Sequence, residues 1–104
     1  MQHIGIRIED ETGNILKTSE FNFAEIVEVV HKTENFKVKF PWIATVDPYG
    51  DTLFNHLQVP YVLEDLAKLS ENLDVGLVKK VKDLVIFLKN INEEAHQYVR
   101  FIGD

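Results

Sequence analysis

Two carboxylates and an imidazole, those of Asp47, Asp51 and His56, lie within ten residues of one another in the sequence. Carboxylates and imidazoles bind divalent metals, and a pair of carboxylates can act as general acid and general base. The spacing matches no established metal signature, and it lacks the alternating acids and the closing Glu of an EF-hand loop. A small metal-dependent hydrolase is therefore the alternative interpretation of this segment, not the preferred one.

The other residues that could carry out catalysis are scattered. The chain has no cysteine, which excludes disulfides, thiolate metal sites and a cysteine nucleophile, and which fits a reducing compartment. No two histidines are spaced as metal ligands on one helical turn, and neither serine lies in a nucleophile-elbow motif. The glycines are isolated, so no phosphate-binding loop is expected. We predict no cofactor, no metal and no enzymatic activity.

The segment Asp47-Pro48-Tyr49-Gly50 has the composition of a tight type I turn. Asp at the first position accepts hydrogen bonds from the backbone ahead of it, Pro presets its own φ, and Gly takes the left-handed conformation. Residues 42–46 and 51–54 on either side are rich in strand formers, so we predict a β-hairpin with Tyr49 and Asp51 at its tip.

Aromatic and acidic residues gather around this hairpin, and together they predict a binding surface. Exposed aromatics beside carboxylates are suited to recognition of a basic protein. The candidate binding residues are Trp42, Tyr49, Asp51, Tyr61, Glu64 and Asp65.

The elements that must position these residues are predicted from hydrophobic periodicity. Alternating apolar residues predict strands at residues 3–9, 15–21, 36–40 and 42–46, and a spacing of three and four predicts helices at 22–31, 61–73 and 75–91. Asn22 and Asp74 are the expected N-caps of the first and last of these helices. Residues 51–54 and 98–102 complete the set of strands.

The predicted fold is a single α+β domain over residues 1–104. An antiparallel sheet of about five strands carries the helices on one face, and the chain order is ββα ββ αα β. The length of 104 residues is typical of one domain.

The net charge of −6 at pH 7 disfavours general binding to nucleic acid, because an acidic surface repels phosphates. Residues 47–74 hold six acids and one lysine, whereas residues 75–91 hold four lysines and one acid. No stretch is apolar enough for a membrane span, and the first residues do not resemble a signal peptide. We therefore expect a cytoplasmic protein that does not enter membranes.

The run from Trp42 to Asn55, with Leu57-Gln58-Val59-Pro60 after it, resembles a pattern in small, mostly uncharacterised bacterial proteins that also end in an aromatic strand like residues 98–104. Some small acidic proteins of this kind are grouped with the immunity proteins of bacterial toxin systems. The resemblance implies an interaction protein and supplies no catalytic residues.

Three functions follow from the sequence. The preferred one is a non-enzymatic protein-binding domain, toxin-neutralising in the manner of an immunity protein, which acts through the acidic and aromatic residues on a basic partner. The first alternative is the metal-dependent hydrolase built on Asp47, Asp51 and His56. The second is a self-associating structural domain, since Ile86 and Phe87 widen the apolar stripe of residues 75–91 enough for a homodimer.

Overall fold

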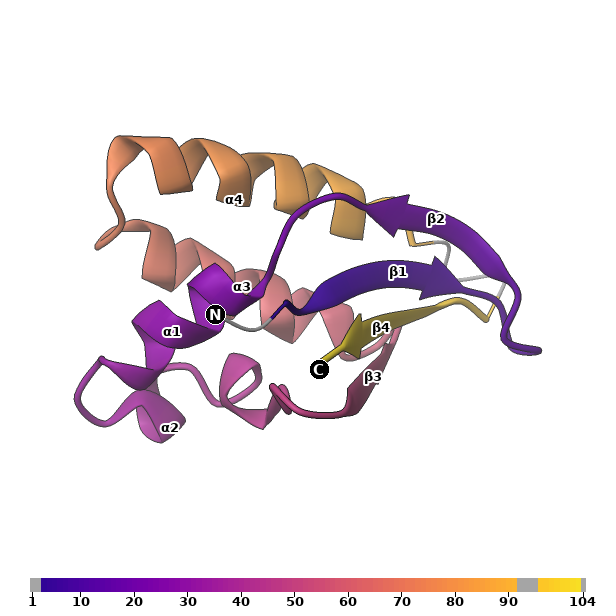
Figure 1. Cartoon of the computed structure of the whole chain (residues 1–104), viewed down its shortest axis with the longest axis horizontal. Helices are drawn as coiled ribbons and strands as arrows, with labels where there is room; N and C mark the ends of the chain where they lie inside the picture. Colours follow the sequence, from indigo (N-terminus) through magenta and orange to yellow (C-terminus); the bar gives the residue numbers. More distant parts are fainter. Residues whose placement is uncertain (1–2, 92–95, 104) are drawn as a thin grey trace.

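The computed structural model describes residues 3–91 and 96–103, which form an antiparallel sheet with helices packed against it (Figure 1). The elements in chain order are β1 (Gly5–Glu9), β2 (Ile15–Ser19), α1 (Ala24–His31), α2 (Phe36–Lys39), the 3-10 turn η1 (Ile43–Thr45), β3 (Asp51–Asn55), α3 (Val59–Ser70), α4 (Val75–Leu88) and β4 (Tyr98–Ile102). The α+β class predicted from the sequence is confirmed.

Within the described residues the sheet has four strands in the order β2-β1-β4-β3, and every neighbouring pair is antiparallel. β1 and β2 form the expected N-terminal hairpin. β4, the last element of the chain, lies between β1 and β3, with Phe101 opposite Ile6 and Val99 opposite Phe54. The first and the last of these strands, β1 and β4, are therefore neighbours at the centre of the sheet (Figure 1).

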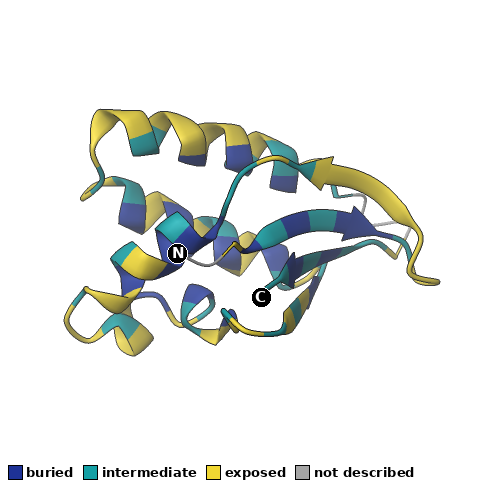
Figure 2. Ribbon diagram, viewed as in Figure 1, coloured by how far each residue is buried: buried dark blue, intermediate teal, exposed yellow. Residues whose placement is uncertain are grey.

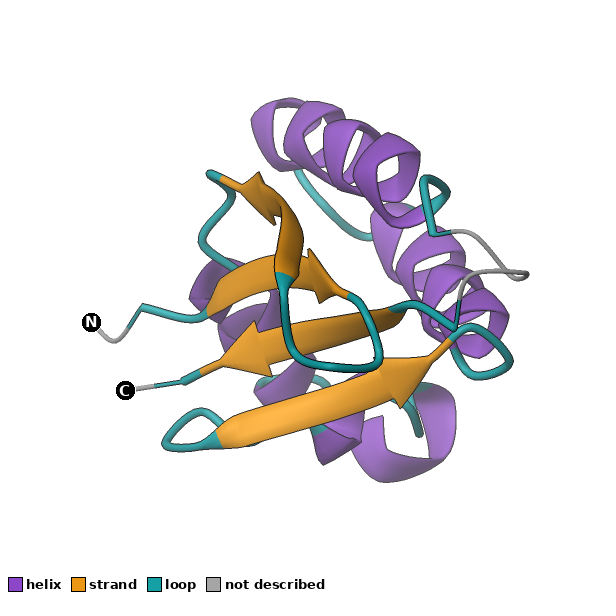
Figure 3. Cartoon of the chain, turned by 90° about the vertical axis from the view of Figure 1, so that its right-hand side faces the viewer, coloured by secondary structure: helices purple, strands orange, loops and turns teal. Residues whose placement is uncertain are grey.

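One face of the sheet forms the core with the helices (Figure 3). Ile6 and Ile8 of β1 and Val99 and Phe101 of β4 alternate toward this face and are buried (Figure 2). Phe23, which begins α1, packs edge-on against Phe101 with ring centroids 4.7 Å apart. The opposite face of β1 and β4 carries polar side chains, as the period of two requires.

The prediction of strands at residues 36–40 and 42–46 is wrong. Phe36–Lys39 is the short helix α2, and residues 43–45 form η1. The alternation of phenylalanine, valine and lysine suits a strand, yet only Phe40 at its end is buried, so no sheet face selects that conformation. The sheet consequently has four strands instead of about five.

The Asp47–Gly50 turn is present, but it joins η1 to β3 and is not the tip of a hairpin. The amide of Tyr49 donates to the Asp47 carboxylate at 2.9 Å, which is the expected role of Asp47. Gly50 does not take the predicted left-handed conformation: among the described glycines only Gly13 has a positive φ, of 88°. β3 pairs with the distant β4 instead of a strand ahead of the turn.

The helices confirm the periodicity argument, and one of the two expected caps lies where it was predicted. Asp74 caps α4 by accepting from the Leu77 amide at 2.8 Å. Asn22 lies one residue earlier than a cap, since Phe23 is the N-cap of α1. Its side-chain oxygen nonetheless accepts from the amides of both Ala24 and Ile4 at 3.0 Å, so it ties the start of α1 to β1.

Candidate functional site

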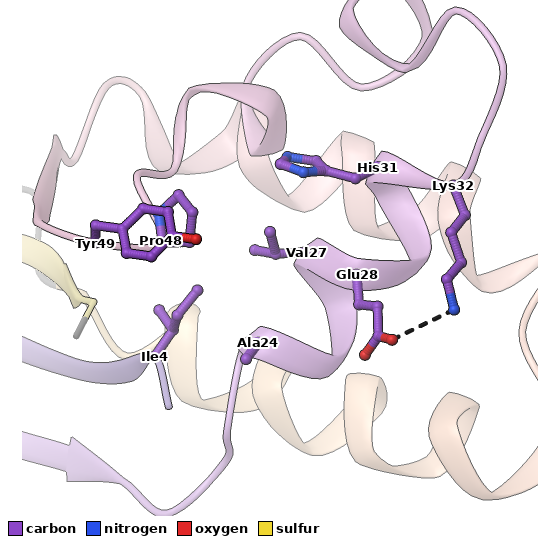
Figure 4. A pocket seen from close by; sticks show the side chains of 8 residues that line it. All are labelled: Ile4, Ala24, Val27, Glu28, His31, Lys32, Pro48 and Tyr49. Atoms are coloured by element: carbon purple, nitrogen blue, oxygen red, sulfur yellow. Dashed lines mark hydrogen bonds and ion pairs between the residues drawn. The ribbon is translucent and has the colours of Figure 1, made fainter. Parts of the chain in front are cut away.

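A hollow of about 480 Å³ opens between α1 and the Asp47–Gly50 turn. Figure 4 shows its lining side chains, which come from the residue before β1, from one face of α1 and from the turn. The lining residues are Ile4, Ala24, Val27, Glu28, His31, Lys32, Pro48 and Tyr49. We refer to this feature as the α1–turn hollow.

The floor of the α1–turn hollow is apolar and belongs to the core. Ile4, Ala24 and Val27 are all buried. Ala24, Val27, Glu28 and His31 follow the helical spacing of three, four and seven, so one face of α1 supplies both the floor and part of the rim. The Phe23 amide donates to the carbonyl of Ile4 at 2.9 Å, which fixes this end of α1 against the start of the sheet.

The rim of the hollow is polar and exposed. Glu28 pairs with Lys32 at 3.3 Å, one helical turn further along α1 (Figure 4). His31 packs its ring against Phe36, with centroids 4.8 Å apart. Tyr49 is 73% exposed, so its ring stands at the mouth of the hollow and is available for contact.

The turn that carries Tyr49 is held by contacts on both sides. The amide of Asp47 donates to the Thr52 hydroxyl at 2.9 Å, and the amide of Gly103 donates to the carbonyl of Gly50 at 2.8 Å. The backbone of Gly103 lies so close to Pro48 that an added Cβ would come within 2.5 Å of the Pro48 carbonyl. The end of β4 thus packs directly against the turn and fixes where Tyr49 stands.

The other predicted aromatic residues form a separate cluster. Trp42 and Tyr61 stack with ring centroids 5.2 Å apart, and Trp42 meets Phe54 edge-on. Asp65 is buried and accepts from the amides of Trp42 and Ile43 at 2.8 and 3.1 Å. Asp65 therefore joins α3 to the start of η1 and is not free for a partner.

Glu64, one helical turn beyond Tyr61 on α3, is exposed. Of the six predicted binding residues, the structure thus brings Trp42, Tyr61 and Asp65 together, and Glu64 lies on the exposed side of the same helix. It places Tyr49 at the α1–turn hollow. The sixth residue, Asp51, joins a charge cluster on the sheet.

Glu9, Arg7, Arg100 and Asp51 form this charge cluster on the sheet face that points away from the core. The side chain of Glu9 is only 3% exposed. Arg7 donates its Nε hydrogen to Glu9, Arg100 donates from Nε to both Glu9 oxygens at 3.1 and 3.0 Å, and Arg100 also reaches Asp51 at 3.1 Å.

The two arginines determine the ionisation of Glu9. Burial raises the pKa of Glu9, but the hydrogen bonds and the attraction of Arg7 and Arg100 outweigh burial and hold that pKa below its ordinary value of 4.5. The sequence alone does not predict this cluster. The period of two places Arg7 and Glu9 on one face of β1, but the approach of Arg100 depends on the pairing of β1 with β4.

The residues of the hydrolase alternative do not converge. Asp51 is the first residue of β3 and His56 follows its last residue, so five steps along an extended strand separate their Cα atoms by roughly 17 Å. Asp47 accepts from the Tyr49 amide, and Asp51 pairs with Arg100. No three His, Asp or Glu side chains within residues 3–91 and 96–103 are arranged to hold a metal ion.

Two further findings bear on function. No helix in the described part of the chain is both long and apolar enough to cross a membrane. Comparisons with protein-family models, with curated proteins and with solved structures find no match for this chain. The function is therefore inferred from the chain's own residues.

Proposed function

We propose that this protein is a non-enzymatic protein-binding domain whose α1–turn hollow receives an apolar side chain of the partner. The observation that carries the proposal is the combination of a buried apolar floor with a polar rim and the exposed Tyr49. Hollows of this size that combine apolar walls with a few polar groups are the usual places where proteins bind ligands and anchor side chains.

The surroundings of the hollow suit binding by contact. Tyrosine is enriched among the residues that dominate binding energy at interfaces. Because Asp47, Thr52 and Gly103 hold the turn, the backbone that carries Tyr49 is fixed before a partner arrives, which lowers the entropy cost of association.

We further propose that the partner is basic. The protein carries a net charge of −6, and the exposed Asp47 begins the turn at the hollow. Such a charge attracts a basic protein and raises its association rate at low ionic strength. A small acidic inhibitor of a bacterial toxin is the version of this function that the resemblance of residues 42–60 favours.

Site-specific photocrosslinking in the source cells tests the location of the surface. Benzoylphenylalanine replaces Tyr49 in one variant and Val38 in the control, since Val38 is 81% exposed on α2. We expect a discrete crosslinked partner from position 49 and none from position 38. Equal crosslinking from both positions, or none from position 49, contradicts the proposal.

The partner identified in this way then allows affinity to be measured by calorimetry. We expect Tyr49→Ala to weaken binding by about tenfold or more while folding is unchanged, because the side chain is exposed. Tyr61→Ala is the matched control, an exposed tyrosine of the other aromatic cluster. If Tyr61→Ala weakens binding and Tyr49→Ala does not, the binding surface is the Trp42–Tyr61 cluster.

A further inference from the structure

A second apolar surface lies between α3 and α4 and shares no residue with the α1–turn hollow. A groove of about 420 Å³ runs between the two helices. Its floor includes Leu66 and Val81, which are buried in the core. Its walls include Ala67, Lys82 and Ile86, which are exposed, so the groove opens to solvent.

α4 carries more apolar residues than its contacts with the rest of the chain can bury. Val81, Leu84 and Leu88 form its buried face. Ile86 nevertheless remains 65% exposed and Val75 is more exposed still (Figure 2). A helix that is apolar on more than one face normally has a covering element on each of them.

On the sides that border the groove, the exposed charges of α3 and α4 differ in sign. The other exposed charges lie elsewhere: Asp83 of α4 lines a separate hollow with Lys80 and Glu25, and Lys68 of α3 pairs with Asp65. On α4 the residues at spacings of four, seven and eleven from Val75 are Lys79, Lys82 and Ile86, so one stripe has lysines at its centre and apolar residues at its ends.

On α3 the corresponding stripe includes Glu64 and Ala67. Glu71 follows one helical turn later, directly after the last residue of α3. None of Glu64, Glu71, Lys79 and Lys82 forms an ion pair within the described residues. Lys82 lines the groove itself, and the exposed Lys79, Glu64 and Glu71 lie on the outer surface beside it. Two acids on one side of the groove and two lysines on the other are therefore left without ion pairs.

We propose that a second copy of this chain covers the groove, with α4 of each copy lying over α3 of the other. A two-fold axis parallel to the helices generates this arrangement, because it exchanges the two sides of the helical hairpin. Each lysine stripe then faces a glutamate stripe, and each Ile86 reaches the groove of the other copy.

The alternative two-fold axis, perpendicular to the helices, is disfavoured by charge. It stacks α4 on α4 and brings Lys79 and Lys82 against the lysines of the second copy, and like charges in contact cost free energy. The chain itself supplies the exposed Ile86, the groove and charges of both signs. A second copy therefore fits this surface better than an unrelated helix does.

The size of the face predicts a weak dimer. α4 has 14 residues, about 21 Å of helix, and two helices side by side are roughly 20 Å wide. A contact of this footprint lies at the small end of specific interfaces, so association in the micromolar range is expected.

Sedimentation velocity over roughly a hundredfold range of protein concentration tests the proposal. We expect the wild-type chain to shift from monomer to dimer, and Ile86→Glu to weaken the dimer by about tenfold or more. Val38→Glu is the matched control, since it puts the same charge on an exposed valine of α2 and should leave the dimer unchanged. A wild-type chain that stays monomeric throughout overturns the proposal, as does a dimer that Ile86→Glu leaves intact.

Charge reversal tests the arrangement of the helices. Lys79→Glu/Lys82→Glu and Glu64→Lys/Glu71→Lys should each be monomeric alone, because both reverse the charge on one side of each contact. An equimolar mixture should form a heterodimer, since all contacts between the two variants are then between opposite charges. If both variants are monomeric and the mixture stays so, the helices are not arranged as proposed.

Discussion

Arg100 of β4 and Glu9 of β1 form an ion pair on the sheet face opposite the core, with the Nε of Arg100 at 3.1 and 3.0 Å from the two carboxylate oxygens of Glu9. The pair joins the first strand of the chain to the last. Arg7 donates its Nε hydrogen to the Oε2 oxygen of the same carboxylate, which Arg100 also contacts. Glu9 is thus a buried charge whose cost of burial is offset by two cations.

Glu9→Gln is predicted to destabilise the fold by about 2 kcal/mol, because it removes the anion and leaves two neighbouring arginines unbalanced. Urea unfolding followed by circular dichroism measures the change. Arg7→Gln is the milder comparison, at about 1 kcal/mol, since Arg100 still holds both carboxylate oxygens. Equal stability of Glu9→Gln and wild type would show that the cluster adds nothing to the fold.

Acid is predicted to remove this stabilisation. The folded-state pKa of Glu9 lies below its ordinary value, so the ionised carboxylate stabilises the fold above that ordinary value. The contribution declines as the pH falls below the ordinary value of 4.5 and is lost once the pH has fallen through the folded-state pKa. Urea unfolding at several pH values should therefore show a steeper loss of stability for wild type than for Glu9→Gln. Parallel curves for the two proteins would contradict the prediction.

Asp65→Ala is predicted to destabilise the fold by about 2 kcal/mol, because the buried amides of Trp42 and Ile43 lose their shared acceptor. Asp65→Asn keeps an oxygen in the same place and should cost less. Trp42 is the only tryptophan, so its fluorescence reports the site directly. We expect a red-shifted emission in Asp65→Ala, and an unshifted spectrum would mean that η1 holds its place without this carboxylate.

Gly103→Ala is predicted to cost about 1 to 3 kcal/mol, because the new methyl group would lie 2.5 Å from backbone atoms of Pro48. Gly50→Ala is the matched comparison. Its methyl group meets the Asp47 carboxylate at 2.8 Å, and that side chain can rotate away. Thermal unfolding of both variants should rank Gly103→Ala as the less stable, and the reverse order would contradict the packing of β4 against the turn.

The fold was predicted from the sequence wherever local periodicity and burial agree. The helices α1, α3 and α4 have apolar residues at spacings of three and four, and nearly all of their buried residues belong to these stripes. β1 and β4 alternate in the same way between a buried and a polar face. Local pattern and tertiary environment select the same conformation in these segments.

Residues 36–46 were predicted as strands because their composition favours strands, and there the prediction failed. The stretch pairs with no strand of the described sheet, and β3, the strand expected to pair with it across the turn, pairs with β4 instead. The buried carboxylate of Asp65 instead holds the first amides of η1 from α3, more than 20 residues further along the chain. Whether a segment of strand-forming residues becomes a strand depends on neighbouring strands, and no local pattern specifies those neighbours.

The candidate sites, like the fold, were predicted only where local sequence decides them. Tyr49 was singled out from the sequence, and the structure places it at the rim of a hollow. The floor of that hollow, which includes Ile4 and Val27, was not predicted. An apolar residue in a periodic pattern indicates burial, but the pattern does not indicate that a hollow lies above it. The expected grouping of six binding residues separates into three places, since Asp65 is buried and Asp51 is paired with Arg100.

The sequence by itself determined the α+β class, the helical hairpin of α3 and α4 and the acidic charge, because these depend on composition and on neighbours a few residues apart. Only the tertiary structure decided that β4 enters the centre of the sheet, that Arg100 reaches Glu9, and that α1 meets the Asp47–Gly50 turn to form the hollow. Each of these contacts joins residues far apart in the chain, and the pairing of β4 with both β1 and β3 fixes where they meet.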